Sequence, residues 1–118
     1  MKLFDSEWKV MEVLWQAGDL TAKEISLRLA EQIGWNKNTT YTVIKKCIDK
    51  GAIARLEPNF LCHAQISKQE AQKEEAALLV DKVFGGSAEL LFASILSDRK
   101  LSKEELSRLR ALVEELDT

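Results

Sequence analysis

Two helix starts and a helix stop lie within the segment TAKEISLRLAEQIGWNKNTTYTVIKKCIDKGAI, residues 21–53. Thr21 and Glu24 have the spacing of a capping box, in which the hydroxyl and the carboxylate each bind a free backbone N–H at the helix start. Gly34 suits the left-handed position just beyond a helix, and Asn36 is a good N-cap for the next helix. The segment therefore predicts two helices joined by a short turn, as in a helix-turn-helix.

Apolar side chains at three- and four-residue steps predict another helix before these two, at residues 6–17, which makes it the first of three along the chain. Asp5 and Ser6 are alternative N-caps for it, and Gly18 follows its end. The predicted inner faces of the three helices comprise Trp8, Met11, Leu14 and Trp15, then Ile25, Leu29 and Ile33, then Val43, Ile44, Cys47 and Ile48. Trp8, Trp15 and Trp35 are interpreted as packing anchors.

After Gly51 the pattern changes from helical to extended. Residues 53–56 and 60–66 predict the two strands of a hairpin, and Glu57-Pro58-Asn59 between them is a turn signal. The second strand alternates, with one apolar face made of Phe60, Cys62, Ala64 and Ile66. Because an isolated hairpin is only marginally stable, we expect this face to lie against the helices as a wing.

Residues 68–118 predict three further helices. The first is polar at its start and apolar at its end, and Gly85-Gly86-Ser87 terminates it. A short apolar helix at residues 88–96 follows, and a capping box at residues 102–105 opens the last one. The fold class expected is mainly α with a small β-hairpin wing: a winged helix-turn-helix head at residues 1–67 and a C-terminal helical dimerisation tail at residues 68–118.

The tail carries more apolar side chains than three short helices can bury among themselves. Burying one Leu or Phe side chain is worth roughly 1.5–3 kcal/mol, so exposure of several favours association. A two-fold homodimer is the commonest solution. The predicted dimer interface comprises Leu79, Val83, Phe84, Leu90, Leu91, Ile95, Leu106, Leu109, Val113 and Leu116. The alternative is that the tail folds back on the head in one monomeric core.

Composition and charge exclude several classes of protein. The chain has 118 residues, 46% of them hydrophobic, and a formal net charge of −2. It has no apolar run long enough to span a membrane and no signal-peptide layout, so we expect a cytoplasmic protein without membrane association. The two cysteines, Cys47 and Cys62, are too few for a disulfide scaffold and are expected to be buried free thiols.

Basic residues concentrate in residues 36–55, which contain five of them against the single acid Asp49. With the apolar face of the third helix turned inward, its outward face is short, polar and able to form hydrogen bonds. Asn can bind an adenine edge, Thr a thymine methyl or a phosphate, and Lys a guanine or a phosphate. The predicted DNA-binding residues are Lys37, Asn38, Thr39, Tyr41, Thr42, Lys45, Lys46 and Arg55. The alternative interpretation of this stripe is an ordinary solvated helix face.

No motif in the sequence indicates catalysis or a cofactor. Cys47, Cys62 and His63 lack the paired spacing of metal ligands. There is also no nucleophile motif, glycine-rich phosphate loop or pair of carboxylates in an apolar setting. We therefore expect neither an enzyme nor a bound metal or cofactor.

Several short motifs stand in a characteristic order along the chain: Glu7-Trp8 through Val13-Leu14-Trp15, LTAKEI at residues 20–25, Trp35 with Asn38-Thr39-Thr40, KGAI at residues 50–53 and FGGS at residues 84–87. Together with the order of three helices, wing and helical tail, these motifs resemble the BlaI/MecI family of penicillinase and methicillin-resistance repressors, which also includes copper-responsive repressors. The similarity covers nearly the whole chain.

The resemblance implies a homodimer that binds a palindromic operator in double-stranded DNA, places its third helix in the major groove, and represses resistance-related genes of the beta-lactam type or similar genes. It places the contacts at Asn38, Thr39, Tyr41, Thr42 and Lys46. Family members often carry Lys where Asn38 stands and Arg where Tyr41 stands, and basic residues at the wing tip. These departures predict a different operator and weaker phosphate contact by the wing.

Regulation differs from the family pattern as well. Antibiotic-responsive members are inactivated when a sensor protease cuts an Asn-Phe bond in the tail, and the aligned bond here is Ser94-Ile95. Copper-responsive members need a cysteine-rich C-terminus, whereas the last cysteine here is Cys62. The release signal is therefore either cleavage of altered specificity by such a protease or a signal that the chain does not reveal. The alternative function is a winged-helix module that binds protein instead of DNA through the same face.

Overall fold

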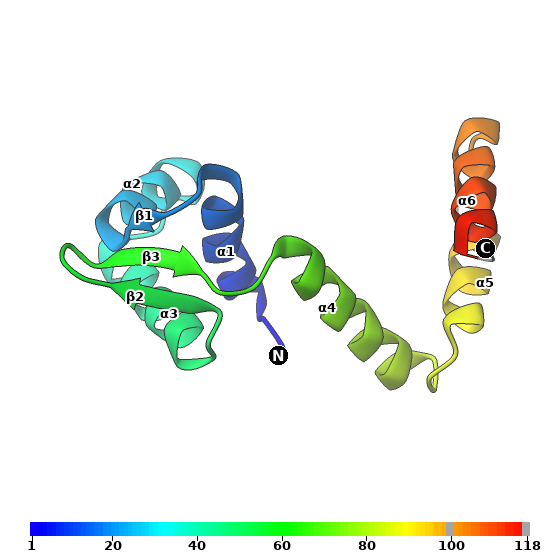
Figure 1. The fold of residues 1–118 in the computed structure, drawn as a ribbon, viewed down its shortest axis with the longest axis horizontal. Coiled ribbons are helices and arrows are strands. Elements are labelled where there is room, and N and C mark those ends of the chain that lie inside the picture. The colour runs from blue at the N-terminus through cyan, green and yellow to red at the C-terminus, as the bar shows by residue number, and fades with distance from the viewer. Residues whose placement is uncertain (99–100, 117–118) are drawn as a thin grey trace. The chain divides into compact units, whose positions relative to one another are not determined.

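The computed structural model describes residues 1–98 and 101–116 and divides the chain into two compact units, Met1–Ala76 and Ala77–Thr118. The first unit contains α1 (Asp5–Ala17), β1 (Leu20–Thr21), α2 (Ala22–Ile33), α3 (Lys37–Asp49), β2 (Ile53–Leu56) and β3 (Leu61–Ala64) (Figure 1). α4 (Lys68–Val83) contains the division, and α5 (Ala88–Asp98) and α6 (Lys103–Leu116) belong to the second unit. The mainly helical fold with a small wing is confirmed; the domain boundary after residue 67 stays a prediction.

The sheet has three strands in the order β1-β3-β2, all antiparallel, where the sequence predicts only a two-stranded hairpin (Figure 1). Leu20 and Thr21 pair with Cys62 and Leu61, and the Ala22 N–H donates to the Phe60 carbonyl over 3.0 Å. The prediction misses β1 because two residues directly before a helix are too few to show an alternating pattern. This strand attaches the start of α2 to the wing.

Local hydrogen bonds set the ends of the head helices. Thr21 and Glu24 form the predicted reciprocal capping box of α2, with N···O distances of 3.1 Å in both directions. Gly34 takes the predicted left-handed conformation after α2, at φ 73°. The predicted caps of α1 are wrong: Phe4 is its N-cap, because the Glu7 carboxylate reaches back and accepts the Phe4 N–H at 2.7 Å.

The core of the first unit lies among α1, α2, α3 and the sheet. The side chains with less than 2% exposure include Val10, Met11, Ile25, Ile44, Cys47 and Cys62. Ile33, predicted to face inward, is 43% exposed because it lies in the last turn of α2. Trp8, Trp15 and Trp35 are partly buried and pack against the core, as predicted.

Both cysteines are buried free thiols, in agreement with the prediction. Desolvation by burial raises the pKa of Cys47 to about 12 and that of Cys62 to about 11. Both groups therefore stay neutral at physiological pH and act as small apolar core residues.

An ion pair between a buried carboxylate and a half-buried ammonium joins the end of α3 to α1. The Glu7 side chain is 1% exposed, and its Oε1 lies 2.6 Å from Lys50 Nζ, at the C-cap of α3. Lys50 Nζ also donates to the Lys2 carbonyl over 2.7 Å. Removing one member of such a pair leaves the other without its partner, which is strongly destabilising. The pair thus helps to set the position of α3 in the head.

The second unit is built from short helices with exposed apolar side chains. Ser102 and Glu105 form the predicted reciprocal capping box of α6, with distances of 3.1 and 3.3 Å. The predicted interface residues Leu79, Val83, Leu90, Ile95, Leu106, Leu109 and Val113 are exposed, whereas Phe84 and Leu91 are half-buried. The side chain of Leu116 lies outside the described residues. Across residues 1–98 and 101–116, none of the helices combines the length and apolarity needed to cross a membrane.

Candidate nucleic-acid interface

α3 presents the predicted polar face to solvent and buries the opposite face. Thr40, Val43, Ile44 and Cys47 are buried against the head core. The predicted contact residues on the other side of the helix are exposed, except for the half-buried Tyr41: Lys37, Asn38, Thr39, Thr42, Lys45 and Lys46. The helix period therefore separates a packing face from a polar face about three turns long.

The start of α3 is fixed by its N-cap. Asn36 Oδ1 accepts the Thr39 N–H at 2.8 Å, as predicted for this residue. The N–H groups of Lys37 and Asn38 have no partner within a helix, since they belong to its first turn. These donors and the positive end of the helix dipole make the start of α3 suited to a phosphate group.

One hydrogen bond restricts what Thr42 can offer to a ligand. Its hydroxyl donates to the Asn38 carbonyl over 2.8 Å, within the same helix. With that hydrogen engaged, Thr42 can contact a partner as an acceptor or through its methyl group. Asn38 lies one turn earlier on the same exposed face, and its side-chain amide forms no hydrogen bond within the described part of the chain.

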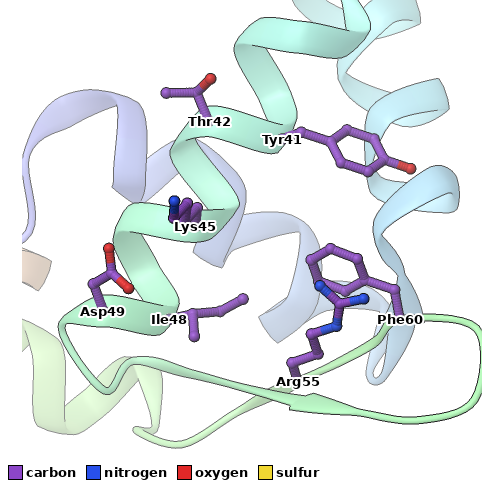
Figure 2. Close-up of a pocket in the computed structure, with 7 residues that line it drawn as sticks. All are labelled: Tyr41, Thr42, Lys45, Ile48, Asp49, Arg55 and Phe60. Carbon is purple, nitrogen blue, oxygen red and sulfur yellow. The ribbon is translucent and has the colours of Figure 1, made fainter.

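Side chains from α3 and the wing meet in a set of aromatic and cation–π contacts, of which Figure 2 shows Tyr41, Phe60 and Arg55. The rings of Tyr41 and Phe60 meet edge to face, with centroids 6.0 Å apart. The Arg55 guanidinium carbon lies 3.6 Å from the centroid of Phe60, and Lys37 Nζ lies 5.5 Å from that of Tyr41. Tyr41 is thus engaged in packing as well as lying on the predicted contact face.

Three residues of the site are absent from the predicted set, Ile48, Asp49 and Phe60, and Phe60 is the one that contacts both Tyr41 and Arg55. Its alternation with Cys62 indicates only an apolar wing face, and the partners Arg55 and Tyr41 lie on other elements. Its backbone has φ 53°, following Asn59 at φ 72°. Positive φ is uncommon for a bulky residue, and here it coincides with the contact between the wing and α3.

Figure 2 shows a depression between α3 and the wing, open to solvent. Seven residues line it: Tyr41, Thr42, Lys45, Ile48, Asp49, Arg55 and Phe60. Four of them, Tyr41, Thr42, Lys45 and Arg55, belong to the predicted DNA-binding set. Its charged side chains are two cations and one carboxylate, so the depression itself is only weakly basic.

The acidic wing tip holds Arg55 in an ion pair. Arg55 Nε lies 2.5 Å from Glu57 Oε1, and the Phe60 N–H donates to Glu57 Oε2 over 3.5 Å. The hydrogen bond from Arg55 lowers the pKa of Glu57 below its usual value. Both side chains are exposed, at 49% and 61%. Glu57 is therefore ionised at neutral pH and neutralises the cation nearest to it.

The remaining sequence candidates are not among the residues that line this depression. His63 Nδ1 is 2.8 Å from Asp19 Oδ1 at the solvent-exposed surface, and Cys47 and Cys62 are buried. In the part of the chain that the structure describes, no cluster of His, Cys, Asp and Glu side chains could hold a metal ion. Ser94 and Ile95 lie within α5, and both are exposed.

Comparison with known proteins places these features in a family. The model of a family described as penicillinase repressor matches residues 3–115. The methicillin resistance regulatory protein MecI of Staphylococcus aureus (strain N315) is 24% identical over 114 residues, which cover 95% of this chain and 93% of that protein. The penicillinase repressor of Bacillus licheniformis is 22% identical, over 97% of this chain and 91% of its own.

A solved structure supports the fold of the head. The DNA-binding domain of the repressor BlaI, determined in solution, matches with a TM-score of 0.54 and 24% identity. The match covers 58% of this chain and 87% of that domain.

Proposed function

The chain belongs to the penicillinase repressor family, and from this premise we propose that it binds operator DNA through α3 and the wing. It is a DNA-binding transcriptional repressor, not an enzyme, and regulation of beta-lactam resistance genes fits its family. The observation that carries the proposed mode of binding is the exposed polar face of α3. This face begins at the backbone N–H groups of Lys37 and Asn38, which have no partner within the helix, and it lies beside the wing.

We assign different tasks to the residues of this face. Asn38, with a free side-chain amide, reads adenine, and the Thr42 methyl group meets a thymine methyl. Lys37, Lys45, Lys46 and Arg55 pair with phosphates, which fix the position of the head on the duplex. Thr39 lies next to Asn38 at the helix start, where it can add a hydrogen bond to a phosphate or a base. Tyr41 contributes from the edge of the depression that it shares with Phe60.

The tail supplies a homodimer in this proposal. Phe92, Leu96, Leu106, Leu109 and Val113 line an apolar groove between α5 and α6. Leaving five such side chains in water costs several kcal/mol, at roughly 1.5–3 kcal/mol for each one fully buried. A second copy of the chain can cover the groove with the same residues, as a two-fold interface requires. Two heads related in this way match a palindromic operator.

Release of the repressor by an Asn-Phe-specific sensor protease is not part of the proposal, because Ser94-Ile95 occupies the aligned position. A protease of other specificity would find this bond exposed but within α5, so the helix must unwind before the bond can enter an active site. We place the protein in the cytoplasm, where operator DNA is accessible.

The assignment of base and phosphate contacts is tested by three single substitutions on α3. Asn38→Ala and Thr42→Ala should relax base preference at defined operator positions, with about 1–3 kcal/mol less discrimination for Asn38. Lys46→Ala should weaken binding to all sequences alike and reduce the salt slope by about 1. The measurement is selection from randomised duplexes, followed by titration of the selected and scrambled sequences.

Equal, sequence-independent losses from all three substitutions would contradict the assignment of base readers. Absence of duplex binding by the folded, dimeric wild-type protein at low salt would point instead to a winged-helix module that binds another protein.

A further inference from the structure

We propose that Glu57 is an internal competitor of DNA phosphate for Arg55, and that it thereby limits the affinity and the salt dependence of DNA binding. This inference rests on the proposed function, because it takes Arg55 to be a phosphate contact. Glu57 would then affect DNA binding through Arg55, without contacting the DNA itself.

Contacts with Phe60 hold the Arg55 side chain in place beside α3. The Arg55 guanidinium carbon lies 3.6 Å from the centroid of the Phe60 ring, within cation–π distance, so contact with the ring restricts where the guanidinium can lie. The Phe60 ring is supported in turn by Tyr41 on α3. Arg55 thus holds its N–H groups in a defined position beside α3, and a guanidinium held in place in this way can bind a phosphate through two parallel hydrogen bonds.

One of these N–H groups, at Nε, is already occupied by the Glu57 carboxylate. Glu57 Oε1 lies 2.5 Å from Arg55 Nε, two residues along the same hairpin. A carboxylate and a phosphate use the same donors in the same geometry, so they exclude each other at Nε. Since the carboxylate is attached to the protein, its effective concentration at Arg55 is high whatever the DNA concentration. A phosphate must therefore displace Glu57 or share the guanidinium with it.

The cost of this displacement is small but measurable. An exposed ion pair of this kind is worth about 0.2–1 kcal/mol, which corresponds to as much as about fivefold in affinity. A phosphate whose cation is already neutralised also releases less counterion, and one full phosphate contact contributes about 0.9 to the salt slope. Glu57 should therefore lower the affinity and flatten its dependence on salt.

Glu57→Gln isolates the charge from the shape. The amide is isosteric with the carboxylate, and its oxygen can still accept the Phe60 N–H that Glu57 Oε2 accepts at 3.5 Å. Asp49→Asn provides the matched control, because Asp49 lines the same depression but forms no ion pair in the part of the chain described by the structure. The two variants remove the same charge from the same surface, and only one of them frees Arg55.

The experiment titrates a fluorescein-labelled DNA duplex of mixed sequence with the full-length protein at several salt concentrations, by fluorescence anisotropy. Phosphate contacts supply most of this non-specific binding, so the operator sequence is not needed. The proteins compared are wild type, E57Q, D49N, R55Q, and the doubles E57Q/R55Q and D49N/R55Q. We expect E57Q to bind about 1.4- to fivefold tighter than wild type, with a salt slope steeper by as much as about 0.9.

The gain from E57Q should vanish in the R55Q background, whereas any gain from D49N should be the same in both backgrounds. If wild type binds and E57Q binds equally, or if its gain persists in R55Q, Glu57 does not act through Arg55 and the inference is overturned. If neither wild type nor E57Q binds the duplex at low salt, the proposed function itself fails. These results are distinguishable from one another.

Discussion

Phe60→Ala should destabilise the head by about 2–3 kcal/mol. A fully buried Phe→Ala costs about 3–5 kcal/mol, and Phe60 is only partly buried, so about half of that applies to its packing. The edge contact with Tyr41 adds about 0.5–1.5 kcal/mol and the cation–π contact with Arg55 about 0.5–1 kcal/mol, partly overlapping with the packing. The same change should weaken DNA binding by a few-fold, since Arg55 loses its platform.

Glycine at the same position provides the matched comparison. Phe60 has φ 53°, and a side chain in this left-handed region costs roughly 1–2 kcal/mol that glycine does not pay. Alanine keeps this cost and loses the ring. Phe60→Gly should therefore be more stable than Phe60→Ala by about 1 kcal/mol, the reverse of the usual order in regular secondary structure.

Urea unfolding measures both effects, with the fluorescence of Trp8, Trp15 and Trp35 as the probe and the protein concentration held constant. The explanation of the wing contact is wrong if Phe60→Ala changes the free energy of unfolding by less than about 0.5 kcal/mol, the range of an ordinary surface substitution. It is also wrong if Phe60→Gly is the less stable of the two.

Two further predictions concern the tail and the core. Leu109→Asp together with Val113→Asp should give monomers that bind operator poorly, because both side chains line the apolar groove. Ser107→Asp on the same helix should leave the mass measured by sedimentation equilibrium at that of a dimer. An unchanged mass for the double variant would contradict the proposed interface. Burial raises the pKa of the Cys47 thiol from 9.0 to about 12. The stability that the neutral thiol contributes is therefore complete below pH 9 and is lost as the pH rises toward 12, by at most about 1.4 kcal/mol per pH unit. Cys47→Ala should flatten the fall of the urea midpoint with pH, and parallel curves of midpoint against pH for wild type and variant would refute this.

The parts of the fold set by local sequence could be predicted. The caps Thr21 and Asn36 and the stop at Gly34 act on backbone groups within a few residues, so their chemistry can be read directly from the sequence. Periodicity likewise identifies the buried face of α3 and leaves its polar face outward. The family resemblance then predicts a function for those exposed residues, which their types alone do not.

The parts that depend on contacts between distant segments could not be predicted. β1 forms because Leu20 and Thr21 pair with the edge of β3, and two residues are too few to show the alternating pattern that predicts a strand. α1 is capped by Phe4 because Glu7 lies close enough to bind its N–H, which outweighs the intrinsic capping preference of Asp5 and Ser6. The contacts of Phe60 with Tyr41 and Arg55 likewise form only once β2, β3 and α3 have come together.

The most direct test of the central claim is a footprint of the purified full-length protein on the DNA upstream of its own coding region, with excess non-specific competitor present. Sequence-specific binding by a dimer predicts a protected, roughly palindromic site whose half-sites lie about one helical turn apart or a multiple of it. No protection from the folded, dimeric protein at low salt would contradict the claim, and the polar face of α3 would then have to bind a protein.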